Sequence, residues 1–207
     1  MSILVLTSDT LSSPAAAGQI EYTSPIFAAT PIGTQRGIVP TQQYYRLDSA
    51  LAGANSTSAQ NIFGVGVTLS ASTVYEFEGL YVFQKTAGAT SHNFQLGFGG
   101  TATTNNILYM GAGLDIGSAT VAVADSAPIS FTNNATTALT VTSFATASVV
   151  IGFIIRGTVS INAGGTFIPQ YTLSAAPGGA YSTVAGSYIR INPLSASGSA
   201  TNVGTWA

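Results

Sequence analysis

Apolar and polar residues alternate with a period of two along several stretches of this chain, and helical periodicity is almost absent. In TVYEFEGLYVF (73–83) the odd positions include four aromatic residues, Tyr75, Phe77, Tyr81 and Phe83. The even positions hold two valines, a leucine and two glutamates, so that both faces are partly apolar. Because successive side chains of a strand point to opposite faces, this pattern predicts a β-strand.

Two further stretches alternate in the same way. HNFQLGF (92–98) has four residues in one phase, which predicts a strand with a single buried face: His92, Phe94, Leu96 and Phe98. The stretch between the first two strands, KTAGATS (85–91), has the Gly, Ser and Thr content of a hairpin loop. SVVIGFIIRGTVSIN (148–162) is long enough for a core strand.

Shorter strand candidates fill much of the remaining chain: SIL near the start, NIFGVGVTL, NNILYMGAG, ATVAVA, ALTVTSF, FIPQYTL and GSYIRINPL. Short strands at short spacing, separated by Gly, Pro and Asn turns, are typical of β-sandwiches and jelly rolls. We therefore expect an all-β fold in which residues 43–207 form an antiparallel β-sandwich or jelly roll.

The first 42 residues show little periodic pattern and contain four prolines, Pro14, Pro25, Pro31 and Pro40. Proline cannot donate a hydrogen bond to a strand ladder. We therefore expect residues 1–42 to form an extended N-terminal arm. Such an arm needs a partner, because ordering a backbone costs about 1 to 2 kcal/mol per residue in entropy.

Residues of the arm, of its junction with the sandwich and of the C-terminus are candidates for contacts with a larger assembly or a neighbouring subunit. The candidate contact residues are Ile26, Phe27, Arg36, Ile38, Tyr44, Tyr45, Arg46 and Trp206. The apolar residues of the arm would be buried against the partner, and the arginines and tyrosines would form hydrogen bonds at the junction. The tryptophan would anchor the C-terminus to the core or to a neighbour.

The composition predicts an oligomer. Charged residues make up 6% of the chain, against about 25% in an ordinary soluble domain. Hydrophobic residues make up 46%, and the mean hydropathy is +0.39, yet no apolar run approaches the ~20 residues of a membrane helix. Obligate interfaces resemble a domain core cut in half. The surplus apolar surface is therefore expected between the subunits of a homo-oligomer.

Charge and residue counts exclude several function classes. The net charge is -2 and the five Lys and Arg residues are scattered, which argues against nucleic acid as a partner. The chain has no Cys and a single histidine, so thiolate and His-rich metal sites are excluded. MSILVLTSDT lacks the basic region and apolar length of a secretory signal, and we expect synthesis in the cytoplasm.

Glu76 and Glu78 are the first candidates for catalysis. On one strand face they would lie about 6.5 to 7 Å apart, a separation that overlaps the spacing of glycosidase carboxylates. Acid/base catalysis, however, needs two different environments, and neighbours on one sheet face share theirs. We therefore interpret the two glutamates as residues that lie on the polar face of a strand or pair across it with Lys85 or Arg156. His92 is in phase with apolar residues and is interpreted as a hydrogen-bonded histidine at a core edge or interface.

No other motif in the sequence indicates a catalytic, phosphate-binding or metal-binding site. A GxSxG motif is absent, and LGFGGTATTNN (96–106) lacks the GK[ST] ending of a phosphate loop. Asp115 and Asp125 lack the regular acidic repeat of a calcium site and are expected in turns or loops. We therefore predict no catalytic, cofactor-binding or metal-binding residue, and an enzyme is not expected.

Several phrases together resemble virion proteins of tailed bacteriophages, namely head decoration proteins, head fibres and tail-fibre tips. They are GQIEYTSPIFAATP (18–31), RGIVPTQQYYRLDSA (36–50), YEFEGLYVFQKTAGATSHNFQLGFGGTAT (75–103), RGTVSINAGGTFIPQYTLSAAPGG (156–179), GSYIRINPL (186–194) and GTWA (204–207). The resemblance implies a β-sandwich with jelly-roll topology that forms a homotrimer in the virion. It also implies synthesis in the host bacterial cytoplasm, with the major capsid protein or other virion proteins as partners.

Two positions of the protein on the phage particle are compatible with this resemblance. The chain has no long β-helix or coiled-coil shaft, which favours a capsid decoration, or cement, protein that stabilises the shell. The alternative is a receptor- or glycan-binding tip of a tail fibre or head fibre, with a host-surface glycan as partner. Neither reading needs a cofactor, a nucleic acid or a membrane.

Overall fold

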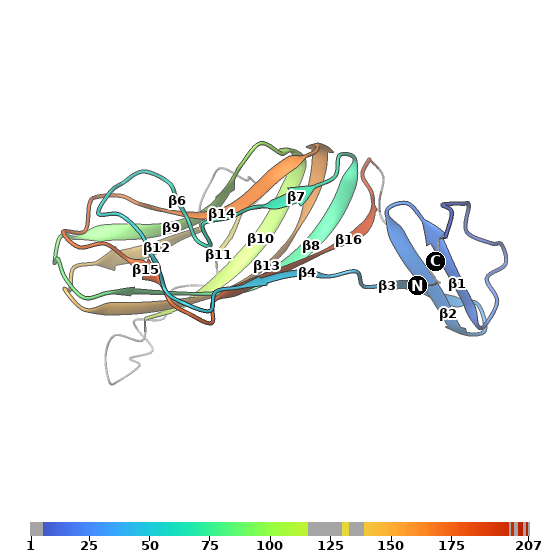
Figure 1. Cartoon of the computed structure of the whole chain (residues 1–207), viewed down its shortest axis with the longest axis horizontal. Helices are drawn as coiled ribbons and strands as arrows, with labels where there is room; N and C mark the ends of the chain where they lie inside the picture. The colour runs from blue at the N-terminus through green and yellow to red at the C-terminus, as the bar shows by residue number, and fades with distance from the viewer. Residues whose placement is uncertain are drawn as a thin grey trace, which may run out of the picture.

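The computed structural model of the chain describes residues 6–115, 130–132, 139–198, 200, 203, 204 and 206. Within these residues every regular element is a β-strand, and every strand pair is antiparallel. Two sheets form a sandwich, and a third, smaller sheet lies beside it (Figure 1). The expectation of an all-β antiparallel sandwich is confirmed, and jelly-roll topology stays a prediction.

The larger sheet of the sandwich has the order β11-β10-β13-β8 and divides beyond β8 into two branches. β15 and then β5 pair near one end of β8, whereas β16 and then β4 pair along the rest of it. The strands are β4 (Gln43–Arg46), β5 (Leu51–Ala52), β8 (Thr73–Lys85), β10 (Thr103–Asp115), β11 (Ser130–Thr132), β13 (Val149–Ala163), β15 (Ser182–Thr183) and β16 (Tyr188–Ala196).

The smaller sheet of the sandwich has the order β12-β9-β14, and β14 pairs along its other edge with β6 and β7. Its strands are β6 (Gln60–Asn61), β7 (Val67–Leu69), β9 (His92–Gly99), β12 (Leu139–Phe144) and β14 (Gly165–Leu173). The candidates SIL (2–4) and ATVAVA (119–124) and residue Asp125 lie outside the described residues.

The core lies between these two sheets and is built from the phases that the alternation predicted. The aromatic odd positions of β8 and all four in-phase residues of β9 are buried. Phe94 is fully buried at the centre of an aromatic cluster, with ring centroids 4.7 Å from Phe83, 5.0 Å from Tyr171 and 5.5 Å from Phe153. These strand phases are therefore confirmed.

The expectation of a hairpin at residues 85–91 is wrong. β8 belongs to the larger sheet and β9 to the smaller one, so the segment crosses from one sheet to the other. The reason is that both edges of β8 are already paired, with β13 on one side and with β15 and β16 on the other. No free edge of β8 remains for β9 to join.

The expectation of a merely extended N-terminal arm is also wrong. Residues 19–39 form a three-stranded antiparallel sheet, β1-β2-β3, with strands β1 (Gln19–Thr23), β2 (Ile26–Ile32) and β3 (Gln35–Val39). The prolines do not prevent the sheet, since Pro25 lies in the β1–β2 turn and Pro31 lies where the β2–β3 register shifts. Gly33, at φ +55°, helps to close the short turn between Ile32 and Gln35.

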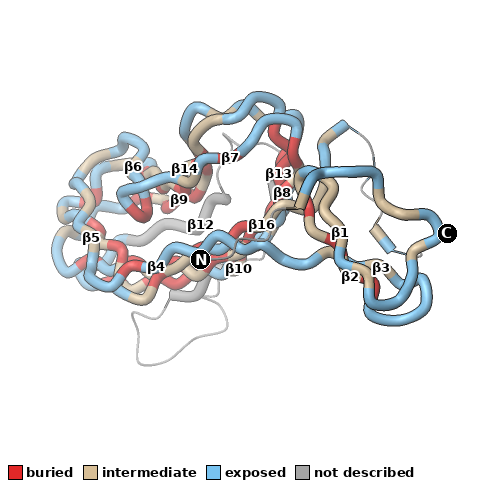
Figure 2. Tube along the Cα trace, turned by 45° about the vertical axis from the view of Figure 1, so that its right-hand side comes forward, coloured by how far each residue is buried: buried red, intermediate tan, exposed pale blue. Residues whose placement is uncertain are grey.

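This N-terminal sheet stands apart from the sandwich, with which it is connected by residues 40–42 (Figure 1, Figure 2). β4 begins at Gln43, where the sandwich was expected to begin, and β16 is a sandwich strand that contacts β2. The N-terminal sheet buries Ile26, Ala28 and Thr30, whereas the sandwich core begins at Leu47. The described C-terminal residues lie against the same sheet, with Gly204 close to the backbone of Arg36.

Candidate functional site

Arg36 is engaged within the N-terminal sheet. Its guanidinium lies 2.8 Å from the Glu21 carboxylate and donates to the Ser12 carbonyl oxygen at 2.7 Å. Both charged side chains are largely buried, at 15% and 16% exposure. The Ser12 backbone N–H, the Ser12 hydroxyl and Arg36 hold the pKa of Glu21 below its usual value. Arg36 therefore fastens residues 6–18 and β3 to β1, a role within the chain that sequence reasoning did not assign to it.

The apolar residues of the arm that were candidates for partner contacts are buried to different degrees. Ile26 is buried inside the N-terminal sheet, and Phe27 is half-buried with its ring centroid 4.7 Å from that of Tyr22. Ile38 is half-buried opposite Ala28. The apolar residues that this sheet exposes are different ones, Ile20, Ile32 and Val39. Their exposure could not be read from the sequence, because which face is covered depends on how β1–β3 pack.

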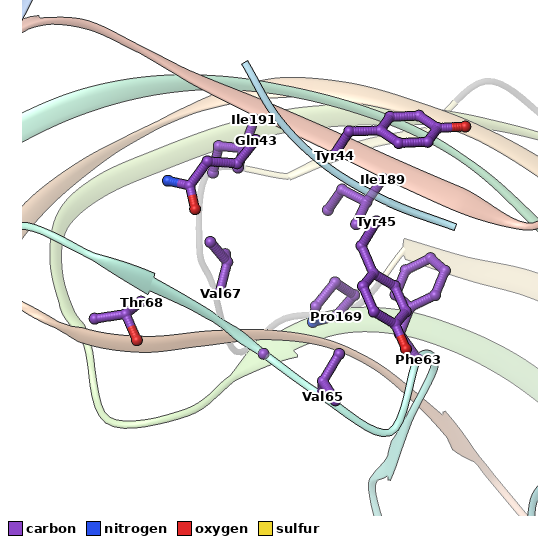
Figure 3. A pocket seen from close by; sticks show the side chains of 11 residues that line it. Gln43, Tyr44, Tyr45, Phe63, Val65, Val67, Thr68, Pro169, Ile189 and Ile191 are labelled. Atoms are coloured by element: carbon purple, nitrogen blue, oxygen red, sulfur yellow. The ribbon is translucent and has the colours of Figure 1, made fainter. Parts of the chain in front are cut away.

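Tyr44 and Tyr45 lie on β4 beside an open groove of about 360 Å³ between the two sheets of the sandwich (Figure 3). Tyr45 points toward Phe63, with an edge-to-face ring contact at 5.8 Å, and Tyr44 points away and stacks on Tyr188 at 5.6 Å. Further lining residues are Gln43, Val65, Gly66, Val67, Thr68, Pro169, Ile189 and Ile191. We call this feature the β4–β7 groove, and none of its described lining residues is charged.

Two sheet edges form the walls of the β4–β7 groove. Among the described strands, β4 pairs with β16 and β7 pairs with β14, and neither has a partner on its other side. The floor includes Ile191 and Phe63, which belong to the buried core. The sandwich is therefore open along this side. Arg46, at the end of β4, pairs with Asp48 and is otherwise exposed.

A second exposed apolar surface lies on the outer face of the larger sheet. Leu108 and Met110 on β10 and Ile154 on β13 are 53%, 41% and 52% exposed. Met110 is in register with Arg156 and Ala112 with Ile154, so these side chains belong to one area of the face. We call it the β10–β13 patch. Sequence reasoning missed it, although the unbroken apolar run SVVIGFII was a signal that both faces of that strand are apolar.

Glu76 and Glu78 lie on the outer face of β8, and of these two only Glu78 forms salt bridges with other described residues. Its Oε2 lies 2.9 Å from the guanidinium of Arg190 on β16 and 3.4 Å from that of Arg156 on β13. Pairing with Arg156 is confirmed. Pairing with Lys85 is wrong, because Lys85 is an odd position of β8 and faces inward. Its ammonium donates at 2.6 Å to the carbonyl oxygens of Gly88 and Thr146.

The Glu76→Gln, Glu78→Gln double variant is expected to fold and to leave any glycan-cleaving activity of a particle unchanged. Both arginines that contact Glu78 are about half exposed or more, and exposed ion pairs contribute roughly 0 to 1 kcal/mol. The free energy of unfolding, measured in urea, should therefore fall by less than about 1 kcal/mol. A folded variant that lost glycan cleavage would contradict our interpretation of the pair.

His92 is a hydrogen-bonded histidine at the edge of the core, as predicted. It is buried, its Nδ1 lies 2.7 Å from the Thr90 carbonyl oxygen and its Nε2 lies 2.8 Å from the Tyr181 hydroxyl. Because a carbonyl only accepts, Nδ1 carries the proton, and in the neutral ring Nε2 accepts from Tyr181. Burial lowers the pKa of His92, and the Lys85 charge lowers it further against the opposing effect of the Thr90 carbonyl.

Stability is expected to fall as the pH falls through the unfolded-state pKa of histidine, about 6.5. The folded-state pKa of His92 is lower, so the unfolded chain binds the proton first, and the loss continues until the pH reaches the folded-state pKa. Thermal unfolding between pH 7.5 and 5.5 should show a falling melting temperature. His92→Asn should flatten this dependence, and an equal slope in the variant would assign it to other groups.

The remaining candidates form no further chemical site. Trp206 is 78% exposed and its indole N–H donates to the Val203 carbonyl oxygen, so it anchors no core contact with the residues that the structure describes. Asp115 ends β10, in a strand and not in the expected turn or loop. Over the described ranges, no group of three or more His, Cys, Asp or Glu residues is placed to hold a metal ion. In the same part of the chain, no helix could cross a membrane.

No protein-family model, curated protein or solved structure matches this chain.

Proposed function

We propose that this chain is a structural, non-enzymatic protein of a tailed-phage virion, which decorates and stabilises the capsid as a homotrimer. The resemblance of its phrases to phage head and fibre proteins supports this function. So does the surface chemistry of a chain in which charged residues make up 6%. Closely packed subunit contacts that bury few charges avoid large desolvation costs.

The observation that carries the proposal is the separate N-terminal sheet. It stands beside the sandwich on a short connection, and its Ile20 and Ile32 are 69% and 65% exposed. Exposed apolar residues on a small sheet outside the main core are suited to docking on another protein. In this proposal the N-terminal sheet attaches the protein to the capsid, and the sandwich faces outward or toward neighbouring copies.

An electron-microscopy reconstruction of the particle tests the proposal. The decoration function predicts hundreds of copies spread over the head, with residues 6–39 on the shell. A few copies at the tail would overturn it.

A receptor- or glycan-binding tip is the second candidate function, and the β4–β7 groove favours it. Small-molecule sites combine apolar and aromatic walls with a few polar groups. The groove offers Tyr45 together with the side chains of Gln43 and Thr68, and no described charged residue lines it. A neutral sugar is the ligand class that would fit. Saturable binding of host-surface glycans, abolished by Tyr45→Ala and accompanied by a tail location, would favour this function over decoration.

A further inference from the structure

The sandwich exposes two apolar surfaces at different places on the larger sheet. The β10–β13 patch lies on the outer face near one end of the strand order, and the β4–β7 groove lies at the far edge, beyond β13, β8 and β16. A contiguous exposed apolar surface marks an interaction site more often than chance exposure does. One chain thus carries two such surfaces, which differ in shape and do not overlap.

The β10–β13 patch and the β4–β7 groove have complementary shapes, one projecting and the other concave. The β10–β13 patch lies on an open sheet face, from which Leu108, Met110 and Ile154 project. The β4–β7 groove is concave, and its exposed rim includes Tyr45 and Val65, at 41% and 45% exposure. Projecting aliphatic side chains and a concave aromatic rim can bury each other.

The charges point to a second copy as the occupant. The groove has no charged lining residue among those described. Beside the patch, Arg156 is already paired with Glu78, which also pairs with Arg190. Counting only the described residues, neither surface therefore offers unpaired clustered charge to attract an acidic or basic partner. Each surface matches the apolar, neutral chemistry of the other.

We propose that the β10–β13 patch of one copy packs against the β4–β7 groove of the next copy, in a closed ring of three. This inference rests on the homotrimer of the proposed function and names the surfaces that form it. A contact between two different surfaces is heterologous and repeats head to tail, so that each copy uses its patch toward one neighbour and its groove toward the other. Rotation through one third of a turn closes the ring.

Complementation between two variants tests the ring. The patch variant carries Leu108→Glu and Ile154→Glu, and the groove variant carries Tyr45→Glu and Val65→Glu. Ile20→Glu with Ile32→Glu in the N-terminal sheet is the matched control, since it places the same two charges on isoleucines that are at least as exposed. Light scattering coupled to size-exclusion chromatography gives the mass, and circular dichroism with thermal unfolding checks the fold. Val65→Glu alone, in the β6–β7 connection, serves if the double groove variant does not fold.

The wild type and the control are expected to be trimers, and each interface variant a monomer. A mixture of the two variants should contain heterodimers of one copy of each, because only one intact patch–groove contact can form between them. Folded patch or groove variants that stay trimeric, or variants that dissociate without forming heterodimers, would overturn the inference.

The inference and the proposed function fail in different ways. A monomeric wild type would remove the homotrimer itself. A trimeric wild type that is insensitive to both sets of substitutions would leave the homotrimer and refute only these surfaces. If the groove variant lost glycan binding while remaining a trimer, the groove would be a sugar-binding site and not a subunit interface. If the protein were located at the phage tail, the decoration function would be refuted, but the patch–groove contact within the trimer would not.

Discussion

Deleting residues 2–40 is expected to leave the sandwich folded and to abolish binding to particles that lack this protein. The sandwich begins with β4 at Gln43, and its core cluster begins at Leu47, so no core residue is removed. The deletion does remove the N-terminal sheet with its exposed Ile20 and Ile32. The measurement is co-sedimentation of the purified protein with undecorated particles, with circular dichroism and thermal unfolding to establish the fold.

A double variant separates the role of these two isoleucines from the effect of a large deletion. Ile20→Glu with Ile32→Glu changes two side chains that are 69% and 65% exposed, where substitutions typically alter stability by about 0.5 kcal/mol or less. We expect this variant to fold fully and to bind undecorated particles at least tenfold more weakly, a change of about 1.4 kcal/mol. Full occupancy by the truncated protein would instead place the attachment surface on the sandwich.

Phe94→Ala is expected to destabilise the sandwich by about 3 to 5 kcal/mol. Phe94 is fully buried, and its ring lies between those of Phe83, Tyr171 and Phe153 from both sheets. Removing it leaves a cavity that three large rings cannot collapse to fill. Since small domains have about 5 to 15 kcal/mol of stability, the variant should unfold at a much lower urea concentration. The measurement is equilibrium unfolding in urea.

Phe27→Ala is the matched control, because Phe27 is a half-buried phenylalanine of the N-terminal sheet and lies outside the sandwich core. It should leave the urea midpoint of the sandwich unchanged. If Phe94→Ala cost less than about 1 kcal/mol, the aromatic cluster would not be the main packing contact between the sheets. If Phe27→Ala lowered the same midpoint equally, the N-terminal sheet and the sandwich would unfold as one cooperative unit.

Side-chain phase is the part of this fold that could be predicted directly. Tyr75, Phe77 and Phe83 are buried and Glu76 is exposed, because alternation along a strand is a local property of the backbone. The same locality placed His92 in the core. It also excludes the pairing of Lys85 with the glutamates, since Lys85 has the opposite parity and faces inward.

Strand neighbours could not be predicted in the same way. The loop chemistry of residues 85–91 suits a hairpin, yet β8 is occupied on both edges by strands that come much later in the chain. The salt-bridge partners of Glu78 could likewise be predicted only in part. Its partner on β13 was foreseen, whereas Arg190 on β16 is 112 residues away, and nothing local brings the two together. Pairing depends on which edges remain free, which is a property of the assembled sheet.

The sequence by itself therefore determined the all-β class, the strand phases and the identity of the core aromatic residues, because these follow from a period of two and from the burial of apolar side chains. Only the tertiary structure decided that residues 19–39 form a small sheet in spite of their prolines, that the sandwich stays open between β4 and β7, and that Leu108, Met110 and Ile154 share one exposed face. Those features depend on contacts between distant segments, and the free edges and uncovered faces that remain are set by the whole fold and not by any one stretch of chain.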